Sequence, residues 1–295
     1  MRWVLHIGIQ KTGSKAIQTF LASYAGMIPD ARVCFPEAGK DLNLLHESLY
    51  WALLEGDSHH LAAAAAETAP QDWDIGVFSC EVLHELPSRR LPIIKDHLGD
   101  PQIILFIRHQ PEAINSLLNQ YVKARRVSFD DIADFRKSMT RYNSKFDYEA
   151  TLSKWAEAFG DDAITPVIYD KKIDAVSLFC DALGVSLPAR YKPAANTNPS
   201  LDAVTYERFF SEKAQISDEN DLWKTVSRLM EENAGGLIEK FQDDGPRLFD
   251  DHTYKEIMRI YEISNDAVGA GFHIDLPFLI HRCNVWSCSV TKWEV

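Results

Sequence analysis

The stretch that decides the fold lies near the N-terminus and reads Val4-Leu5-His6-Ile7-Gly8-Ile9-Gln10-Lys11-Thr12-Gly13-Ser14-Lys15. Residues 4–9 form an apolar run that suits a buried parallel strand, and residues 13–25 follow with apolar side chains at helical spacing. The glycines between them permit a tight turn, and the free N–H groups of a helix start favour an anion. Lys11 adds a positive charge, and Thr12 and Ser14 add hydroxyl groups. We therefore interpret this stretch as a phosphate-binding loop, with an ordinary strand–helix turn and a solvated lysine as the alternative.

The same alternation of strands and helices continues outward from this stretch. The sequence predicts further strands at residues 74–80, 102–107 and 163–169. It predicts helices at residues 41–69, 86–98, 111–125 and 173–183, and then at 201–215, 220–233 and 253–267. This order favours an α/β fold, a three-layer parallel sheet with helices on both faces and a helical C-terminal third. We expect one domain over residues 1–295, with an α/β nucleotide-binding core at 1–190 and a mostly helical part at 200–295.

Composition limits the kind of protein. The 295 residues are 46% hydrophobic and 25% charged, which is typical of a globular chain with a real core. Forty-three acidic against 31 basic residues give a net charge of −12, which argues against a nucleic-acid binder but permits one small basic pocket. The sequence predicts no membrane span and no signal peptide. Five scattered cysteines without a Cys-x-x-Cys pair indicate no zinc site and no disulfide framework, so we expect a cytoplasmic protein.

In parallel α/β sheets, ligands bind outside the carboxyl ends of the strands. Chemistry is therefore expected in the loops that follow Ile9, Cys80 and Ile107. The order of residues in the first of these loops separates two classes of protein. In the nucleotide-triphosphatase loop a lysine comes directly after the second glycine. Here Lys11 precedes Gly13 by two positions, and Ser14 stands between Gly13 and Lys15.

That order resembles the loop of the sulfotransferases that use 3′-phosphoadenosine 5′-phosphosulfate (PAPS), and most closely their bacterial branch. The resemblance implies the P-loop-like sulfotransferase fold and a loop that surrounds the 5′-sulfophosphate, formed here by Lys11, Thr12, Gly13, Ser14, Lys15 and Ala16. The sequence departs from the family at Lys15, where a hydroxyl residue is usual. This departure concerns the local geometry of the loop more than its assignment.

The second part of the resemblance lies at residues 103–116. The family places an arginine at the end of a strand and a serine eight residues later, and both hold the 3′-phosphate of the nucleotide. Arg108 and Ser116 match this arrangement, and a guanidinium group has the planar geometry that suits phosphate. For Arg108 alone, a surface ion pair would be the default interpretation. A softer resemblance is the pair Ser264-Asn265, for which a helix cap or a buried amide is an equal alternative.

The family's chemistry is an in-line transfer of a sulfuryl group. The resemblance implies that Lys11 assists the departing oxygen and that a histidine or glutamate acts as the base on the acceptor. Glu81, at the end of a predicted strand, is our first choice for the base, and His46 is the second. Each has a structural alternative, a carboxylate at a helix start for Glu81 and a residue near the core for His46.

The sequence thus predicts a transferase that moves sulfate from PAPS to a hydroxyl or amine of a small-molecule or saccharide acceptor, with 3′,5′-adenosine bisphosphate as product. No metal, nucleic acid or membrane takes part in this prediction, and it makes no statement on the oligomeric state. Two alternatives remain open. One is a P-loop kinase that uses ATP and magnesium, and the other is a catalytically silent nucleotide-binding protein of the same fold.

Overall fold

A computed structural model of the chain describes residues 1–123, 143–193, 228, 251–274 and 276. The helices expected at 201–215 and 220–233 lie outside the described residues. The elements, in chain order, are β1 Arg2–His6, α1 Ser14–Tyr24, η1 Ala25–Met27, β2 Val33–Cys34, α2 Glu47–Glu55, α3 His59–Thr68, β3 Ile75–Ser79, η2 Leu83–Glu85, η3 Ser88–Arg90, α4 Leu91–Leu98, β4 Gln102–Ile107, α5 Gln110–Lys123, η4 Asn143–Phe146, α8 Tyr148–Phe159, η5 Asp161–Ala163, β5 Ile164–Ile168, α9 Ala175–Leu183 and α12 Asp251–Gly271.

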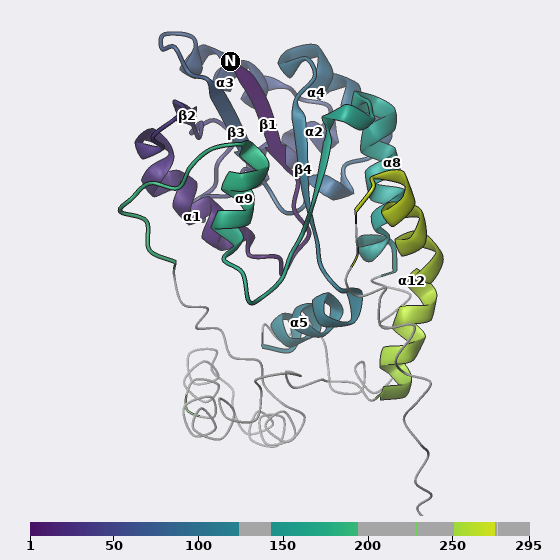
Figure 1. Ribbon diagram of the computed structural model, residues 1–295. Helices are drawn as coiled ribbons and strands as arrows, with labels where there is room; N and C mark the ends of the chain where they lie inside the picture. Colours follow the sequence, from purple (N-terminus) through teal and green to yellow (C-terminus); the bar gives the residue numbers. More distant parts are fainter. Residues whose placement is uncertain (124–142, 194–227, 229–250, 275, 277–295) are drawn as a thin grey trace, which may run out of the picture.

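The described strands form one five-stranded sheet in the order β2-β3-β1-β4-β5, and every pair is parallel. The chain builds the β2–β3 side of β1 first and then crosses to the β4–β5 side. The order of the strands therefore reverses between β1 and β4, and this is where α/β sheets bind their ligands. Both strands end toward the same edge of the sheet, where α5 lies in Figure 1.

Helices cover both faces of the sheet, as the alternation of elements predicts. Val4, Val77 and Ile104 point to one face, in a buried cluster with residues of α1 and α9. Their neighbours along the strands point to the other face, in a cluster with residues of α2, α3, α4, α8 and α12. Figure 1 shows α1 and α9 together in front of the sheet. The three-layer arrangement follows from strands that are apolar on both sides.

The structure differs from the predicted elements at several places. Strand β1 spans Arg2–His6 instead of residues 4–9, and α4 begins at Leu91 instead of residue 86. The helix expected over residues 41–69 begins only at Glu47 and is interrupted at Gly56, which has a φ of +93° and ends α2. The strand β2 was not predicted, because two residues are too few to show a period. Helix α8 was not predicted either. The expected helix at 253–267 corresponds to α12, which packs against α5 and α8.

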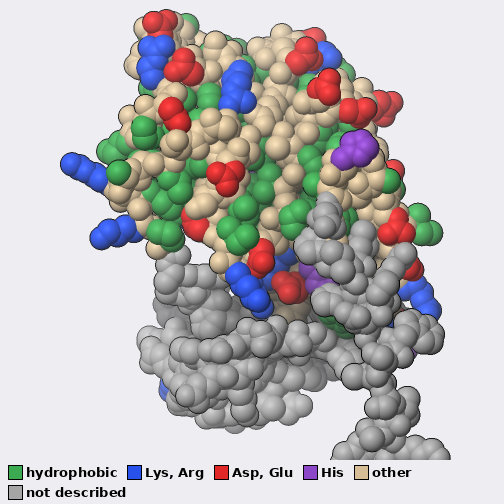
Figure 2. All heavy atoms as spheres, in the orientation of Figure 1, with side chains coloured by type: hydrophobic (Ala, Val, Ile, Leu, Met, Phe, Trp, Pro, Cys, Tyr) green, Lys and Arg blue, Asp and Glu red, His purple; other side chains and the backbone are tan. Residues whose placement is uncertain are grey.

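The outer surface carries charges of both signs. Acidic and basic side chains are interspersed on the face drawn in Figure 2, and near its lower boundary they lie next to one another. No helix in the described part of the chain is long and apolar enough to cross a membrane.

Candidate functional site

The loop after β1 has a backbone that few sequences can adopt. Gly8, Lys11 and Gly13 all have positive φ angles, of +35°, +72° and +83°. A Cβ atom on Gly13 would lie 2.5 Å from the Cβ of Ala175, so only glycine fits there. Within the described residues, no acceptor is found for the backbone N–H groups of residues 11–15, which precede or begin α1. Such an array of N–H groups at a helix start is suited to bind an anion.

The loop's polar side chains divide into internal and outward groups. Thr12 is buried, and its hydroxyl donates a hydrogen bond of 2.6 Å to the carbonyl oxygen of Ile9, so this group closes the loop from within. Ser14 is buried at the first position of α1. Lys15 is exposed and donates to the carbonyl oxygen of Asn43 at 2.5 Å. Lys15, which departs from the family's pattern, therefore ties α1 to the loop before α2. The partly buried Ala16 completes the first turn with a hydrogen bond to Gly13.

Arg108 follows β4 and lies against the phosphate-binding loop. Its Nη1 donates a hydrogen bond of 2.6 Å to the carbonyl oxygen of Lys11, and its guanidinium lies 5.4 Å from the ring centre of Tyr169. Nη2 is 3.4 Å from Glu112, one helical turn further along. The Nε atom is buried without a hydrogen-bond partner among the described residues. Arg108 is thus held in place and still has donor capacity, as a phosphate-binding arginine needs.

Arg108 is also held by a tyrosine that the sequence does not single out. Tyr148, the first residue of α8, donates its hydroxyl hydrogen to the carbonyl oxygen of Arg108 and accepts from its backbone N–H at 3.3 Å. Ser116, the expected partner of Arg108 in phosphate binding, lies in α5 and is partly buried. Its hydroxyl is not joined to Arg108 in this structure.

The pair Ser264-Asn265 anchors α12 to the elements beside the site. The buried amides of Asn265 and Gln110 exchange two hydrogen bonds, of 2.6 and 3.1 Å, at the first residue of α5. Ser264 donates to Asp147 at 2.8 Å and accepts from the N–H of Glu149, at the start of α8. Asn265 is therefore a buried amide, one of the two alternatives given for it above. Ser264 joins α12 to the first turn of α8.

Glu81 lies on the other side of the loop, two residues after β3. The space beside Gly8 is limited by the backbone of Glu81, whose Cα is 3.4 Å from where a Cβ of Gly8 would be. Burial raises the pKa of Glu81, and the positive charge of Lys11 acts in the opposite direction. Burial likewise lowers the pKa of Lys11, with Glu81 opposing and Arg108 adding to the shift. The structure therefore brings Lys11, Glu81 and Arg108 together from the ends of three neighbouring strands.

His46 is fully buried beside the end of β3. Its Nδ1 accepts a hydrogen bond of 3.1 Å from the N–H of Ser79, and its Nε2 is 3.0 Å from the carbonyl oxygen of Pro36. The ring packs edge-on against Phe35 and Phe78 at 4.8 and 4.9 Å. Burial lowers its pKa to about 4. Both ring nitrogens are therefore engaged by backbone groups. A catalytic base needs a free nitrogen that faces the acceptor.

Two further buried histidines surround the same strand end. His6 Nδ1 lies 2.8 Å from the hydroxyl of Ser79, and His84 Nδ1 lies 2.5 Å from the carbonyl oxygen of Glu81. Burial lowers the pKa of His6 to about 3 and that of His84 to about 4. No sequence motif points to the contact of His84 with Glu81, because it depends on the fold. In the described part of the chain, no group of three His, Cys, Asp or Glu side chains is placed to hold a metal ion.

Comparisons with protein families, curated proteins and solved structures show what the chain resembles. No family model matches the chain. An uncharacterized protein from Archaeoglobus fulgidus is 29% identical over an alignment of 149 positions, and the match covers 48% of this chain and 39% of that protein. The chain thus spans well under half the length of this relative.

The solved structures that resemble this fold include the crystal structure of a sulfotransferase from Alicyclobacillus acidocaldarius. It superposes with a TM-score of 0.50, covering 94% of this chain and 98% of that one. The two sequences are 14% identical. At this identity the likeness concerns the fold. The chain has a sulfotransferase-like α/β fold, with its loops arranged at the carboxyl ends of a parallel sheet.

Proposed function

We propose that the protein is a sulfotransferase that moves a sulfuryl group from PAPS to a hydroxyl or amine of a small-molecule or saccharide acceptor. The observation that carries this proposal is the meeting of Lys11, Glu81 and Arg108 at the ends of β1, β3 and β4. There a lysine, a carboxylate of raised pKa and an arginine that donates to the carbonyl oxygen of Lys11 lie beside the loop that precedes α1. The sulfotransferase-like fold supports the same reaction.

The residues present fit a nucleotide with phosphate groups at two positions. The N–H groups of residues 11–15 and the Lys11 side chain would hold the 5′-sulfophosphate. Arg108, with its free Nε, would hold the 3′-phosphate, and Ser116 would add a hydroxyl from α5. The hydroxyl of Thr12 would keep the loop closed instead of binding phosphate, because it already donates to Ile9.

In the reaction, Glu81 accepts the proton of the acceptor's hydroxyl or amine as that group attacks sulfur. Lys11 stabilises the negative charge that develops on the oxygen that leaves with the adenosine bisphosphate. Burial suits both roles. It raises the pKa of Glu81, which makes the carboxylate a stronger base, and it excludes water that would weaken the attraction between Lys11 and the departing oxygen.

Glu81 is preferred to His46 as the base. The carboxylate of Glu81 interacts electrostatically with Lys11, which marks the position of the sulfuryl group. His46 uses Nδ1 and Nε2 for Ser79 and Pro36, so it would have to break a buried hydrogen bond to take up a proton. Its lowered pKa also makes it a weaker base than an ordinary histidine.

The test is direct transfer. The purified protein is incubated with PAPS that carries radioactive sulfur and with a panel of phenols, alcohols, amines and sugars, in the presence of a chelator. Labelled acceptor formed without magnesium is the expected result. Phosphorylation of an acceptor by ATP that requires magnesium would support the kinase alternative instead. Tight binding of the nucleotide without transfer to any acceptor would support the silent nucleotide-binding protein.

A further inference from the structure

The end of β3, which leads to Glu81, pairs with β1 along one edge but with no described strand along the other, where side chains hold it. Strand β2 pairs with β3 only at Ile75 and Gly76, so the outer edge of β3 is uncovered from there onward. At Ser79, on this same edge, the backbone N–H and carbonyl need partners, because unpaired backbone groups in the interior are costly. Ser79 is fully buried, and Glu81 follows it by two residues.

His46 provides both partners for Ser79. Its own backbone N–H donates to the carbonyl oxygen of Ser79 at 3.1 Å, and its Nδ1 accepts from the N–H of Ser79, also at 3.1 Å. Since Nδ1 is an acceptor, the hydrogen of the neutral ring is on Nε2, which donates to Pro36. His46 thus supplies, at Ser79, the hydrogen bonds that a neighbouring strand would otherwise make at the outer edge of β3.

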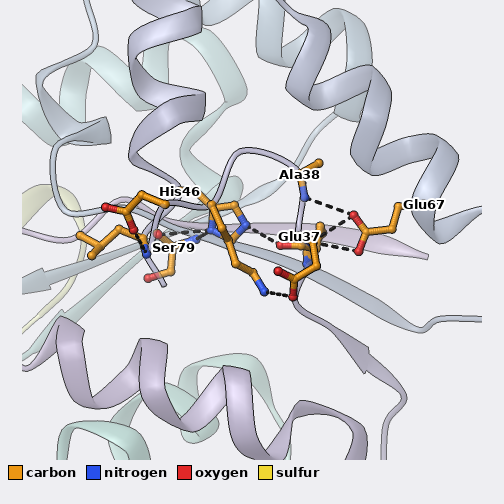
Figure 3. A network of polar contacts seen from close by, with 9 residues as sticks. Glu37, Ala38, His46, Glu67 and Ser79 are labelled. Carbon is orange, nitrogen blue, oxygen red and sulfur yellow. Dashed lines mark hydrogen bonds and ion pairs between the residues drawn. The ribbon is translucent and has the colours of Figure 1, made fainter. Parts of the chain in front are cut away.

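The other side of His46 is itself fixed. Figure 3 shows His46 between Ser79 and the turn at residues 36–38, with Glu67 of α3 beyond that turn. The carboxylate of Glu67 accepts hydrogen bonds from the backbone N–H groups of Glu37 and Ala38, at distances from 2.9 to 3.2 Å. The contacts therefore form a continuous line from α3 through the turn and His46 to the strand end.

His84 holds the same segment from its far end. Its Nδ1–H donates to the carbonyl oxygen of Glu81, and its own carbonyl oxygen accepts from Lys154 of α8 at 2.6 Å. His84 is buried and its Nε2 has no hydrogen-bond partner in the described part of the chain. The backbone of residues 79–81 is thus fixed at both ends by histidines, one before α2 and one in η2.

We infer that His46 and His84 are positioning residues, which fix the backbone of Ser79–Glu81 and so direct the Glu81 carboxylate toward Lys11. The role of Glu81 as the base rests on the proposed function, but the mechanical role of the histidines does not. Direction matters because a misplacement of about 1 Å in a reacting group is enough to reduce turnover about a hundredfold. The charged groups that act on Glu81 are Lys11 and Lys15, which lower its pKa, and Glu47, which raises it.

Two substitutions at His46 separate positioning from catalysis. In His46→Asn the side-chain oxygen takes the place of Nδ1, so it still accepts from Ser79 but loses the contact with Pro36. In His46→Gln the amide takes the place of Nε2, so it keeps the contact with Pro36 and loses Ser79. We expect His46→Gln to lower kcat about 10- to 100-fold with little change in KM for PAPS, and His46→Asn to restore it to within about threefold of wild type. His84→Asn and His84→Gln form a second pair with the same logic, because asparagine keeps a donor toward Glu81.

The second readout is the Glu81 carboxyl group itself, followed by NMR in protein made with carboxyl-labelled glutamate and assigned by its loss in Glu81→Gln. In wild type and in His46→Asn, its pKa should remain above the ordinary 4.5. In His46→Gln the carboxylate is free to turn toward water, so its pKa should fall toward that value. Binding of 3′,5′-adenosine bisphosphate by each variant shows that it is folded.

Three results would overturn the inference. A Glu81 titration that is unchanged in His46→Gln would mean that the histidine does not direct the carboxylate. Equal shifts in the asparagine and glutamine variants would reduce His46 to a packing residue. Loss of transfer in His46→Asn with an unchanged Glu81 titration would make His46 the base. Failure of the proposed function looks different, since wild type would then bind no adenosine bisphosphate while the Glu81 titration would still respond to His46.

Discussion

Replacing Gly13 by alanine puts a methyl group where the phosphate-binding loop has no room for one. The φ of +83° costs an L-residue about 1–2 kcal/mol. The new Cβ would also lie 2.5 Å from the Cβ of Ala175, well inside the usual carbon–carbon contact of about 3.5–4.0 Å, and such overpacking costs about 1–3 kcal/mol. We therefore expect Gly13→Ala to lower the free energy of unfolding by about 2–5 kcal/mol and to weaken nucleotide binding.

Denaturant unfolding of Gly13→Ala, Ala175→Gly, their combination and Gly26→Ala separates the backbone cost from the cost of the overlap. Gly26→Ala is the matched control, because Gly26 has no positive φ and a Cβ there meets nothing within 4 Å. In Gly13→Ala combined with Ala175→Gly, the overlap is removed while the backbone cost remains, so the double-mutant cycle should show a coupling of about 1–3 kcal/mol. If Gly13→Ala unfolds with the same free energy as Gly26→Ala, the described loop geometry is wrong.

Three further predictions concern the site. Lys11→Ala should lower turnover at least about tenfold while the melting temperature stays close to wild type, since the side chain carries charge and has little packing role; wild-type turnover would remove Lys11 from the mechanism. Glu81→Gln should lower turnover about a hundredfold or more, and the acid limb of the wild-type pH–rate profile should lie above 4.5, because a base of raised pKa is protonated as the pH falls; an active glutamine variant with the same limb would assign the base to another group. In the folded protein the pKa values of His6, His46 and His84 lie below the ordinary 6.5, so below pH 6.5 the unfolded state binds more protons than the folded state. Lowering the pH from 6.5 toward 4 should therefore lower the free energy of unfolding by about 1.4 kcal/mol per pH unit for each histidine. The slope in His46→Asn should be smaller by one such increment, and an equal slope would show that this histidine is not held neutral.

The parts of the fold that the sequence predicts are those set by local patterns. Mostly apolar runs predict β3, β4 and β5 and the second half of β1, and the glycines of the first loop predict a tight turn before α1. Strand β2 is different, because its two residues pair with β3 only after the chain has folded. The break at Gly56 was missed because the alanine-rich stretch after it suggested one continuous helix.

The candidate site was predictable to the same extent. Lys11, Glu81 and Arg108 each follow a strand, and parallel strands carry such positions to one edge of the sheet. What the sequence could not show is the direction of each side chain. The contact of Tyr148 with Arg108 joins residues 40 positions apart, and that of His46 with Ser79 joins residues 33 positions apart. Such contacts depend on tertiary packing and leave no periodic pattern.

We propose that this site binds a nucleotide with a phosphate on its 3′ oxygen, and calorimetry with two ligands measures this preference. Each charge-assisted hydrogen bond to that phosphate is worth about 1.5–3 kcal/mol, or roughly 10- to 150-fold in affinity. Wild-type protein should therefore bind 3′,5′-adenosine bisphosphate far more tightly than adenosine 5′-monophosphate. In Arg108→Ala the gap should shrink, because damage to the loop through Lys11 affects both ligands and the lost phosphate contact affects only one. Equal affinity of the wild type for both ligands would show that the site does not recognise the 3′-phosphate.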